Sequence, residues 1–137
     1  MQTIGIVAEY NPFHNGHQYH IHQARAMHPA DGVIAVMSGS FTQRGMPALH
    51  QPASRARAAL EAGAVLVLEL PCAFSVRDAE YFALGGVDIL SRLGFITHLS
   101  FGAEDDIALL KRGAGLLESP TESFQRTLKD LLAQGHS

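Results

Sequence analysis

The sequence predicts an α/β fold in which a parallel sheet carries helices on both faces, followed by two C-terminal helices. Short apolar runs alternate with amphipathic stretches as far as Gly102, and only helical patterns follow that residue. Repeated strand–helix units favour parallel strands with right-handed crossovers, which place helices on both sides of the sheet. With 47% hydrophobic and 17% charged residues, we expect residues 1–137 to form one globular domain.

Four apolar runs are the expected strands. The first begins near Ile4 and ends at the Asn-Pro turn of residues 11–12. The second, residues 33–37, does not alternate with polar residues, so we expect it to be buried on both faces. Residues 64–70 form the third run. The fourth, residues 95–101, alternates in part and is expected nearer an edge of the sheet.

Helical patterns lie between and after these runs. They cover residues 17–27, 54–62, 78–93, 104–117 and 119–134. Gly63 and Gly94 are expected to end the second and third of them. The acidic residues 104–106 suit the positive end of the fourth helix. Ser119, with proline next to it and Glu122 three residues later, predicts a capping box that opens the last helix.

Composition excludes several classes of protein. The longest apolar run, residues 62–68, is too short to cross a bilayer, and the first residues lack the basic segment of a signal peptide, so we expect a cytoplasmic protein. The one cysteine, Cys72, is expected to be a small buried side chain rather than a nucleophile, because no histidine is adjacent. A formal net charge of −3 is unlike the basic excess of stand-alone nucleic-acid binders.

The segment most informative about chemistry is residues 11–17, Asn-Pro-Phe-His-Asn-Gly-His, where a strand ends and a helix opens. Ligands of open α/β sheets bind at the carboxyl ends of strands, and a helix N-terminus attracts phosphate. Gly16 lets a base or phosphate approach the backbone closely. The imidazoles of His14 and His17 can donate to phosphoryl oxygens as charge builds on them. The segment predicts nucleotide binding; exposed turn histidines without a role are the simpler alternative.

Zinc binding is a further alternative, because four histidines lie close together in the sequence: His14, His17, His20 and His22. His17 and His20 lie one helical turn apart, but His22 projects elsewhere, and no cysteine or carboxylate is nearby to complete a tetrahedral site. We therefore expect no metal site built by the chain alone.

The long connection after the second strand, residues 38–51, is a second candidate for ligand contact. It is rich in Gly, Ser, Gln, Arg and Pro, and it follows a strand where a parallel sheet places functional loops. The expected donors to a substrate or phosphate are Ser38, Gly39, Gln43, Arg44 and Arg55. Arg57 and Arg77 extend this set into a possible basic rim over the strand ends, although each arginine alone is equally compatible with a solvated position.

Four strings carry a resemblance to a known family. They are residues 7–17 (Val-Ala-Glu-Tyr-Asn-Pro-Phe-His-Asn-Gly-His), 36–48 (Val-Met-Ser-Gly-Ser-Phe-Thr-Gln-Arg-Gly-Met-Pro-Ala), 69–71 (Glu-Leu-Pro) and 101–104 (Phe-Gly-Ala-Glu). The first string, with its strand and helix, resembles the HxGH nucleotidyltransferase superfamily. Together the strings resemble the bacterial tRNA(Met) cytidine acetate ligase family over nearly the whole chain, which implies a Rossmann-like HxGH nucleotidyltransferase fold.

The resemblance implies an enzyme that activates acetate with ATP to give acetyl-adenylate and pyrophosphate. The acetyl group then passes to the wobble cytidine of elongator tRNA(Met). By the family pattern, ATP with Mg²⁺ is held by Gly102 and by Val7, Ala8, Glu9, Tyr10, Asn11, Pro12, Phe13, His14, Asn15, Gly16, His17, Gln18, Tyr19 and His20. His14 and His17 would be the catalytic groups that stabilise the pentavalent phosphorus as acetate attacks.

Two positions depart from the family pattern, because Met46 stands where glutamate is usual and Ala103 where serine is usual. The family also continues well beyond 137 residues, so the resemblance implies an N-terminal part whose tRNA contacts lie mostly in the missing C-terminal region. Two other functions stay open: a nucleotidyltransferase acting on another small acid or phosphate ester, and an inactive nucleotide-binding or subunit-interaction module.

Overall fold

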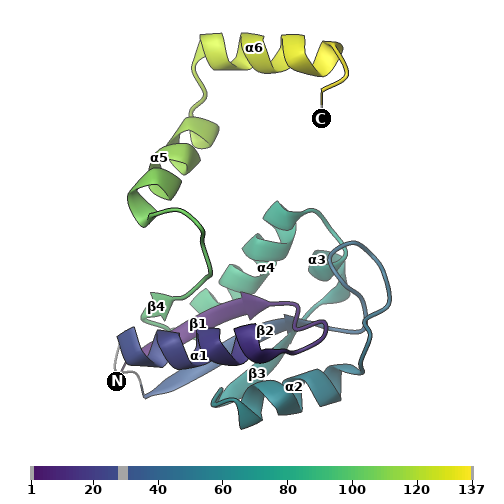
Figure 1. The fold of residues 1–137 in the computed structure, drawn as a ribbon, viewed down its shortest axis with the longest axis vertical. Coiled ribbons are helices and arrows are strands. Elements are labelled where there is room, and N and C mark those ends of the chain that lie inside the picture. Colours follow the sequence, from purple (N-terminus) through teal and green to yellow (C-terminus); the bar gives the residue numbers. More distant parts are fainter. Residues whose placement is uncertain (1, 28–30, 137) are drawn as a thin grey trace. The chain divides into compact units, whose positions relative to one another are not determined.

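The computed structural model describes residues 2–27 and 31–136, and its contacts divide the chain into two compact units between Gly102 and Ala103. The first unit contains a four-stranded sheet and the helices that cover it. The second unit contains two further helices (Figure 1). Each unit is described by itself.

The sheet is parallel, with the strand order β3–β2–β1–β4. The strands are β1 Thr3–Ala8, β2 Gly32–Ser38, β3 Leu66–Leu70 and β4 His98–Leu99. The register sets Thr3 of β1 opposite Gly32 of β2 and Ala8 opposite Met37. β2 pairs with one side of β1, and β3 pairs with the far side of β2. β4 pairs with the other side of β1. The strand order therefore reverses between β1 and β4, which is where open α/β sheets bind ligands.

Helices cover both faces of the sheet, as predicted (Figure 1). They are α1 Asn15–Met27, α2 Pro52–Glu61, the short α3 Cys72–Ser75 and α4 Ala79–Arg92. On one face, Ile21 of α1 packs with Ile4 and Ile6, and Ala59 of α2 packs with Met37. On the other face, Leu90 of α4 packs in a separate cluster with Ile34, Val36 and Leu70. The strand β2 is buried along its whole length because it lies inside the sheet and is covered on both faces.

Two glycines let α4 approach β1 closely. A Cβ atom on Gly86 would lie 2.5 Å from Cγ1 of Val7, and one on Gly5 would lie 2.7 Å from Cδ1 of Leu90. Glycine inside a helix costs stability relative to alanine, so its presence in α4 is explained by packing rather than by helix propensity. A larger residue at either position would push the helix away from the sheet.

The fourth strand is at an edge, as expected, but it is much shorter than the predicted run. Only His98–Leu99 pair as a strand. The backbone still follows β1 on either side, because Thr97 N donates to Thr3 O and Ser100 N donates to Gly5 O, each at 2.9 Å. An edge strand has one partner strand only, so apolar character in the sequence does not by itself extend it.

The second unit contains α5 Ile107–Glu118 and α6 Glu122–Ala133. Asp106 caps α5, since its side chain accepts hydrogen bonds from the N–H groups of Ala108 and Leu109 at 2.7 and 2.9 Å. The prediction that Ser119 caps the last helix is wrong. The cap is Thr121, whose side chain accepts a hydrogen bond from Phe124 N, so proline stands before the helix and not at its first position.

Candidate functional site

His14 and His17 lie at the carboxyl end of β1, where α1 begins two residues earlier than predicted. The carbonyl oxygen of His14 accepts hydrogen bonds from the N–H groups of His17 (2.9 Å) and Gln18 (3.2 Å), and so starts the helix. The two imidazole rings stack, with their centroids 3.8 Å apart and their planes at 28°. The structure therefore brings the two predicted catalytic residues into direct contact.

Backbone hydrogen bonds determine which ring nitrogens of this pair carry hydrogen. Gly16 N donates to Nδ1 of His14 at 3.1 Å, and His14 N donates to Nδ1 of His17 at 3.2 Å. A nitrogen that accepts a hydrogen bond carries no hydrogen, so each neutral ring has its hydrogen on Nε2. The site thus offers two Nε2–H donors side by side.

The pKa of His17 is lowered below its ordinary value of 6.5, first by burial and then by the charges of His14 and His20. His17 is therefore neutral near pH 7. Aromatic rings hold it in place: the ring centroid of Tyr10 lies 4.9 Å from that of His17 in an edge-to-face arrangement, and that of Phe13 lies 5.5 Å away. Burial also raises the pKa of Tyr10 to about 12.

His20 joins α1 to the segment that follows β4. Its Nε2 atom lies 2.9 Å from Oγ of Ser100, a residue 80 positions further along the chain. Burial lowers the pKa of His20, so its ring is neutral near pH 7. Gly102 follows two residues later, and a Cβ atom there would meet nothing within 4 Å. His20 and Gly102, which the resemblance assigns to ATP, therefore belong to adjoining segments with open space beside them.

The long loop after β2 is fastened to the turn after β1 by two side chains of that turn. Oε1 of Glu9 accepts a hydrogen bond from Gln43 N at 2.5 Å, and Oδ1 of Asn11 accepts one from Leu49 N at 2.7 Å. These two family-pattern residues thus direct their side chains to the neighbouring loop.

Arg55 of α2 adds a third and stronger connection between the same two loops. Its guanidinium donates to the carbonyl oxygens of His50 (3.1 Å), Glu9 (2.6 Å) and Gly39. The side chain is 1% exposed. Burial lowers the pKa of Arg55, while the negative charges of Glu69 and Glu9 act in the opposite direction. A buried guanidinium must have its donors satisfied, and here backbone carbonyls satisfy them.

The residues of the predicted rim of phosphate donors differ in their exposure. Ser38, Gly39 and Arg55 are buried, because they form the end of β2 and the attachment of the loop beneath the surface. Gln43 is half-buried, and Arg44 is exposed. Arg77 lies 3.8 Å over the ring of Tyr81, so its charge is engaged in a cation–π contact. Of the five predicted rim residues, Arg44 is the one with a fully exposed cationic side chain.

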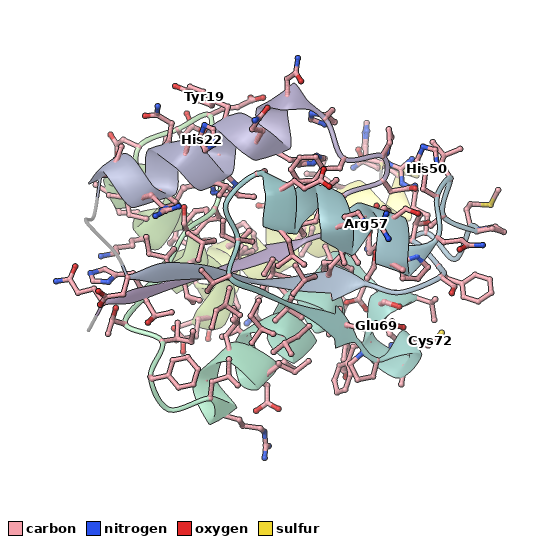
Figure 2. All side chains as sticks on the ribbon, turned by 90° about the horizontal axis from the view of Figure 1, so that it is seen from below. Tyr19, His22, His50, Arg57, Glu69 and Cys72 are labelled. Atoms are coloured by element: carbon pink, nitrogen blue, oxygen red, sulfur yellow. The ribbon has the colours of Figure 1, made fainter. Side chains whose placement is uncertain are left out.

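The remaining residues of the family pattern are distributed along β1 and α1. Val7 and Ala8 end β1, Pro12 and Asn15 are exposed in the turn, and Gln18 is exposed on α1. Figure 2 shows Tyr19 and His22 on the outer side of α1, away from the sheet. Tyr19 is 65% exposed.

The alternative of a histidine zinc site gains no support from the described residues. Among residues 2–27 and 31–136, no three His, Cys, Asp or Glu side chains come together to hold a metal ion. The expectation of a buried cysteine is wrong: Cys72 is exposed, because it begins the short α3 beyond the end of β3 (Figure 2). No helix in the described part of the chain is long and apolar enough to cross a membrane.

Comparisons with known proteins give a consistent result. A family model described as HIGH Nucleotidyl Transferase matches residues 1–137. The tRNA(Met) cytidine acetate ligase of Clostridium kluyveri is 46% identical over 138 residues, covering 100% of this chain and 34% of that protein. The protein of the same name from Syntrophomonas wolfei is 47% identical over 138 residues, covering 100% of this chain and 33% of that protein.

A solved structure agrees with these sequence matches. The crystal structure of Thermotoga maritima TmcAL bound with alpha-thio ATP superposes with a TM-score of 0.91 at 46% identity. The match covers 100% of this chain and 33% of that chain. This chain therefore spans about a third of the length of the relatives it matches.

Proposed function

The chain belongs to the HIGH nucleotidyltransferase family, and we propose that it binds ATP and activates acetate as acetyl-adenylate, as the first part of a tRNA(Met) cytidine acetate ligase. The observation that carries the proposal is the stacked pair of His14 and His17, with two Nε2–H donors at the carboxyl end of β1. The relative solved with an ATP analogue supports the nucleotide.

In the proposed reaction, a carboxylate oxygen of acetate attacks the α-phosphorus of ATP. The new phosphorus–oxygen bond forms as the bond to pyrophosphate breaks, and pyrophosphate leaves with the electron pair. Negative charge grows on the oxygens around the five-coordinate phosphorus. The Nε2–H groups of His14 and His17 would donate to those oxygens, and the N-terminus of α1 adds a favourable field. Donors already held in position need little reorganisation as the charge develops.

The segment from Val7 to His20, with Gly102, is the proposed cradle for the nucleotide. Open space around Gly102 and the close link between His20 and Ser100 fit a ligand between these segments. Mg²⁺ would neutralise the triphosphate. The described residues bring no three metal-ligating side chains together, so Mg²⁺ would be held without a dedicated protein cage.

The second half of the proposed activity passes the acetyl group to a cytidine of elongator tRNA(Met). The names of the relatives support this acceptor. The net charge of −3 supports the proposal that most tRNA contacts come from residues outside this chain. A role in tRNA modification also implies a cytoplasmic location.

The proposal is tested by exchange of labelled pyrophosphate into ATP, with and without acetate. Exchange that depends on acetate supports it, whereas exchange only with another acid, or with a phosphate ester, supports a different substrate. Binding of ATP with no exchange under any acid would indicate a nucleotide-binding module. Calorimetry with millimolar ATP and Mg²⁺ that shows neither heat nor thermal stabilisation would contradict the nucleotide site itself.

A further inference from the structure

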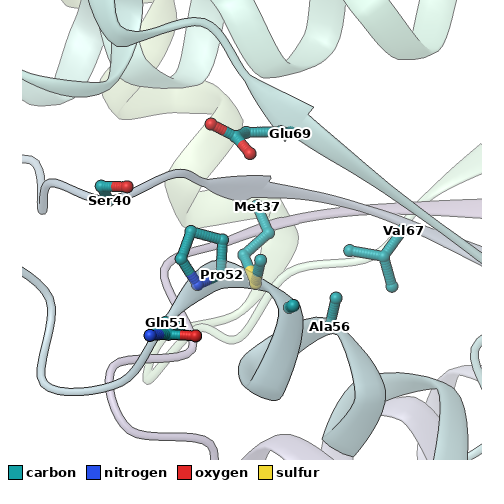
Figure 3. Close-up of a pocket in the computed structure, with 8 residues that line it drawn as sticks. Met37, Ser40, Gln51, Pro52, Ala56, Val67 and Glu69 are labelled. Carbon is teal, nitrogen blue, oxygen red and sulfur yellow. The ribbon is translucent and has the colours of Figure 1, made fainter.

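A hollow lies at the carboxyl ends of β2 and β3, on the face of the sheet that α2 covers (Figure 3). Its volume is about 640 Å³, within the range of small-molecule sites. The lining residues are Met37, Ser40, Gln51, Pro52, Ala53, Ala56, Val67 and Glu69. None of these residues belongs to the nucleotide cradle proposed above.

The hollow has apolar walls on one part, polar Ser40 and Gln51 on another, and one carboxylate in its lining. Met37, Val67 and Ala56 supply apolar surface from β2, β3 and α2, while Glu69 comes from β3 (Figure 3). Glu69 is exposed, and its charge acts on the buried Arg55, but no hydrogen bond within residues 2–27 and 31–136 engages its carboxylate. Gly39 makes room for it, since a Cβ atom there would overlap Oε1 of Glu69. The hollow therefore offers a carboxylate that accepts no hydrogen bond from the described residues, beside apolar surface.

This chemistry selects the kind of ligand. The negative charge of Glu69 repels acetate and phosphate. Apolar surface suits an uncharged flat ring, and the carboxylate can accept a hydrogen bond from a donor on that ring. Cytosine meets both conditions, because a glutamate accepts a hydrogen bond from its exocyclic amine. Uracil has a carbonyl oxygen at the same position, which would face the carboxylate with no hydrogen between them.

We propose that this hollow is the site for the acceptor base, a cytosine ring whose exocyclic amine donates a hydrogen bond to Glu69. The inference rests on the proposed function, because the acceptor is a cytidine in the names of the relatives. The hollow and the His14–His17 pair both lie at the carboxyl ends of the strands, and only β2 separates β1 from β3. Neighbouring strands are about 4.8 Å apart, which places the two sites roughly 10 Å from each other along the sheet.

The test titrates cytidine and uridine separately into the chain and follows the NMR signals of the lining residues. Cytidine is expected to shift the signals of Met37 and Val67 and to bind at least about tenfold more tightly than uridine. Glu69→Gln keeps the size of the side chain but adds an NH₂ donor that can meet the uracil carbonyl. The preference for cytidine should then fall to about threefold or less. Glu61→Gln, an exposed glutamate outside the hollow, is the matched control and should keep the full preference.

Equal binding of the two nucleosides, or a preference unchanged in Glu69→Gln, overturns the proposal. So does a cytidine response confined to residues outside the hollow. If Glu69→Gln fails to fold, Ala56→Phe tests the same site, because a filled hollow should lose cytidine binding while ATP binding persists. ATP is titrated into the same samples. A chain whose NMR signals respond to cytidine but not to ATP counts against the proposed function. A chain whose signals respond to ATP but not to cytidine counts against the base site.

Discussion

The guanidinium of Arg55 donates a hydrogen bond of 2.6 Å to the backbone carbonyl of Glu9, 46 residues earlier in the chain. The same side chain holds the carbonyls of Gly39 and His50. One buried cation therefore fixes the turn after β1 and both ends of the loop after β2. The histidine pair follows that turn, so Arg55 supports the candidate site through the backbone.

Arg55→Lys is expected to destabilise the chain. Lysine is a point donor on a flexible stem and lacks the planar fork that reaches three carbonyls at once. At least one buried carbonyl then loses its partner, which costs about 1 to 3 kcal/mol in the free energy of unfolding. Urea denaturation measures the change. Arg57→Lys, an exposed arginine two residues along α2, should stay within about 0.5 kcal/mol of the wild type. Equal stability of the two variants would refute the role given to Arg55.

His14→Ala and His17→Ala are expected to lower acetate-dependent pyrophosphate exchange on the order of a hundredfold or more, with little change in fold. Each substitution removes an Nε2–H donor that acts mainly on charge formed in the transition state. Exchange is measured in this chain and in a full-length relative that carries the same motif.

His22→Ala is the control for this pair. Its side chain is exposed on the outer side of α1, so exchange and stability should match the wild type (Figure 2). Wild-type exchange in both His14→Ala and His17→Ala would rule out the chemistry assigned to the pair.

Acidification is expected to destabilise the folded chain through His17 and His20. Burial lowers the pKa of each ring below 6.5, so the unfolded chain binds protons at a higher pH than the folded chain. The two neutral rings contribute fully to the free energy of unfolding above the pKa of the unfolded chain. This contribution is lost as the pH falls through the lower pKa values of the folded chain. Each ring adds at most about 1.4 kcal/mol per pH unit to the slope.

Urea denaturation between pH 7.5 and 5 measures this dependence. His20→Gln should reduce the slope. A slope in His20→Gln as steep as that of the wild type would show that proton binding by His20 does not contribute.

Tyr10→Phe is expected to leave stability unchanged or to raise it by up to about 1 kcal/mol. The Tyr10 hydroxyl is buried and has no hydrogen-bond partner among the described residues, so its removal leaves no other group unpaired. The ring contacts with His17 and Phe13 persist. Tyr10→Ala, by contrast, should cost about 3 to 5 kcal/mol. Thermal and urea unfolding compare the two variants, and weaker ATP binding by Tyr10→Phe would show that the hydroxyl meets the ligand.

Local signals account for the parts of this structure that could be predicted from sequence. Gly63 and Gly94 end their helices with φ of +106° and +73°, which glycine adopts without strain. The helix cap at Thr121 was missed because Ser119 carries the same type of signal two residues earlier. The unbroken apolar run of β2 indicated burial on both faces, and the strand is buried throughout.

Contacts between distant segments could not be predicted in the same way. An arginine near the start of a helix has the pattern of an exposed cation, and nothing local indicates that Arg55 reaches Glu9. The same holds for the contact of His20 with Ser100. For the histidine pair, the motif indicated the residues, but the hydrogen positions follow only from the backbone donors of Gly16 and His14.

The isolated chain is expected to bind tRNA weakly and to transfer no acetyl group to it, even where it binds ATP. Binding of a polyanion is usually led by cationic contacts to phosphate, and this chain has a net charge of −3. Of the cations near the candidate site, Arg55 is buried and Arg77 is engaged with Tyr81, which leaves Arg44 and Arg57 exposed. Two exposed charges are strongly screened at physiological salt, where the Debye length is about 8 Å.

A gel-shift titration with elongator tRNA(Met) at physiological salt measures this, with a full-length relative as the positive control. The relative should bind at concentrations at which the isolated chain shows no shift. Lower salt should strengthen whatever binding the chain retains, and Arg44→Ala with Arg57→Ala should weaken it, because both side chains are exposed cations near the candidate site. Micromolar or tighter binding that is selective for tRNA(Met), together with acetyl transfer by the chain alone, would falsify the view that tRNA contacts lie mostly in other residues.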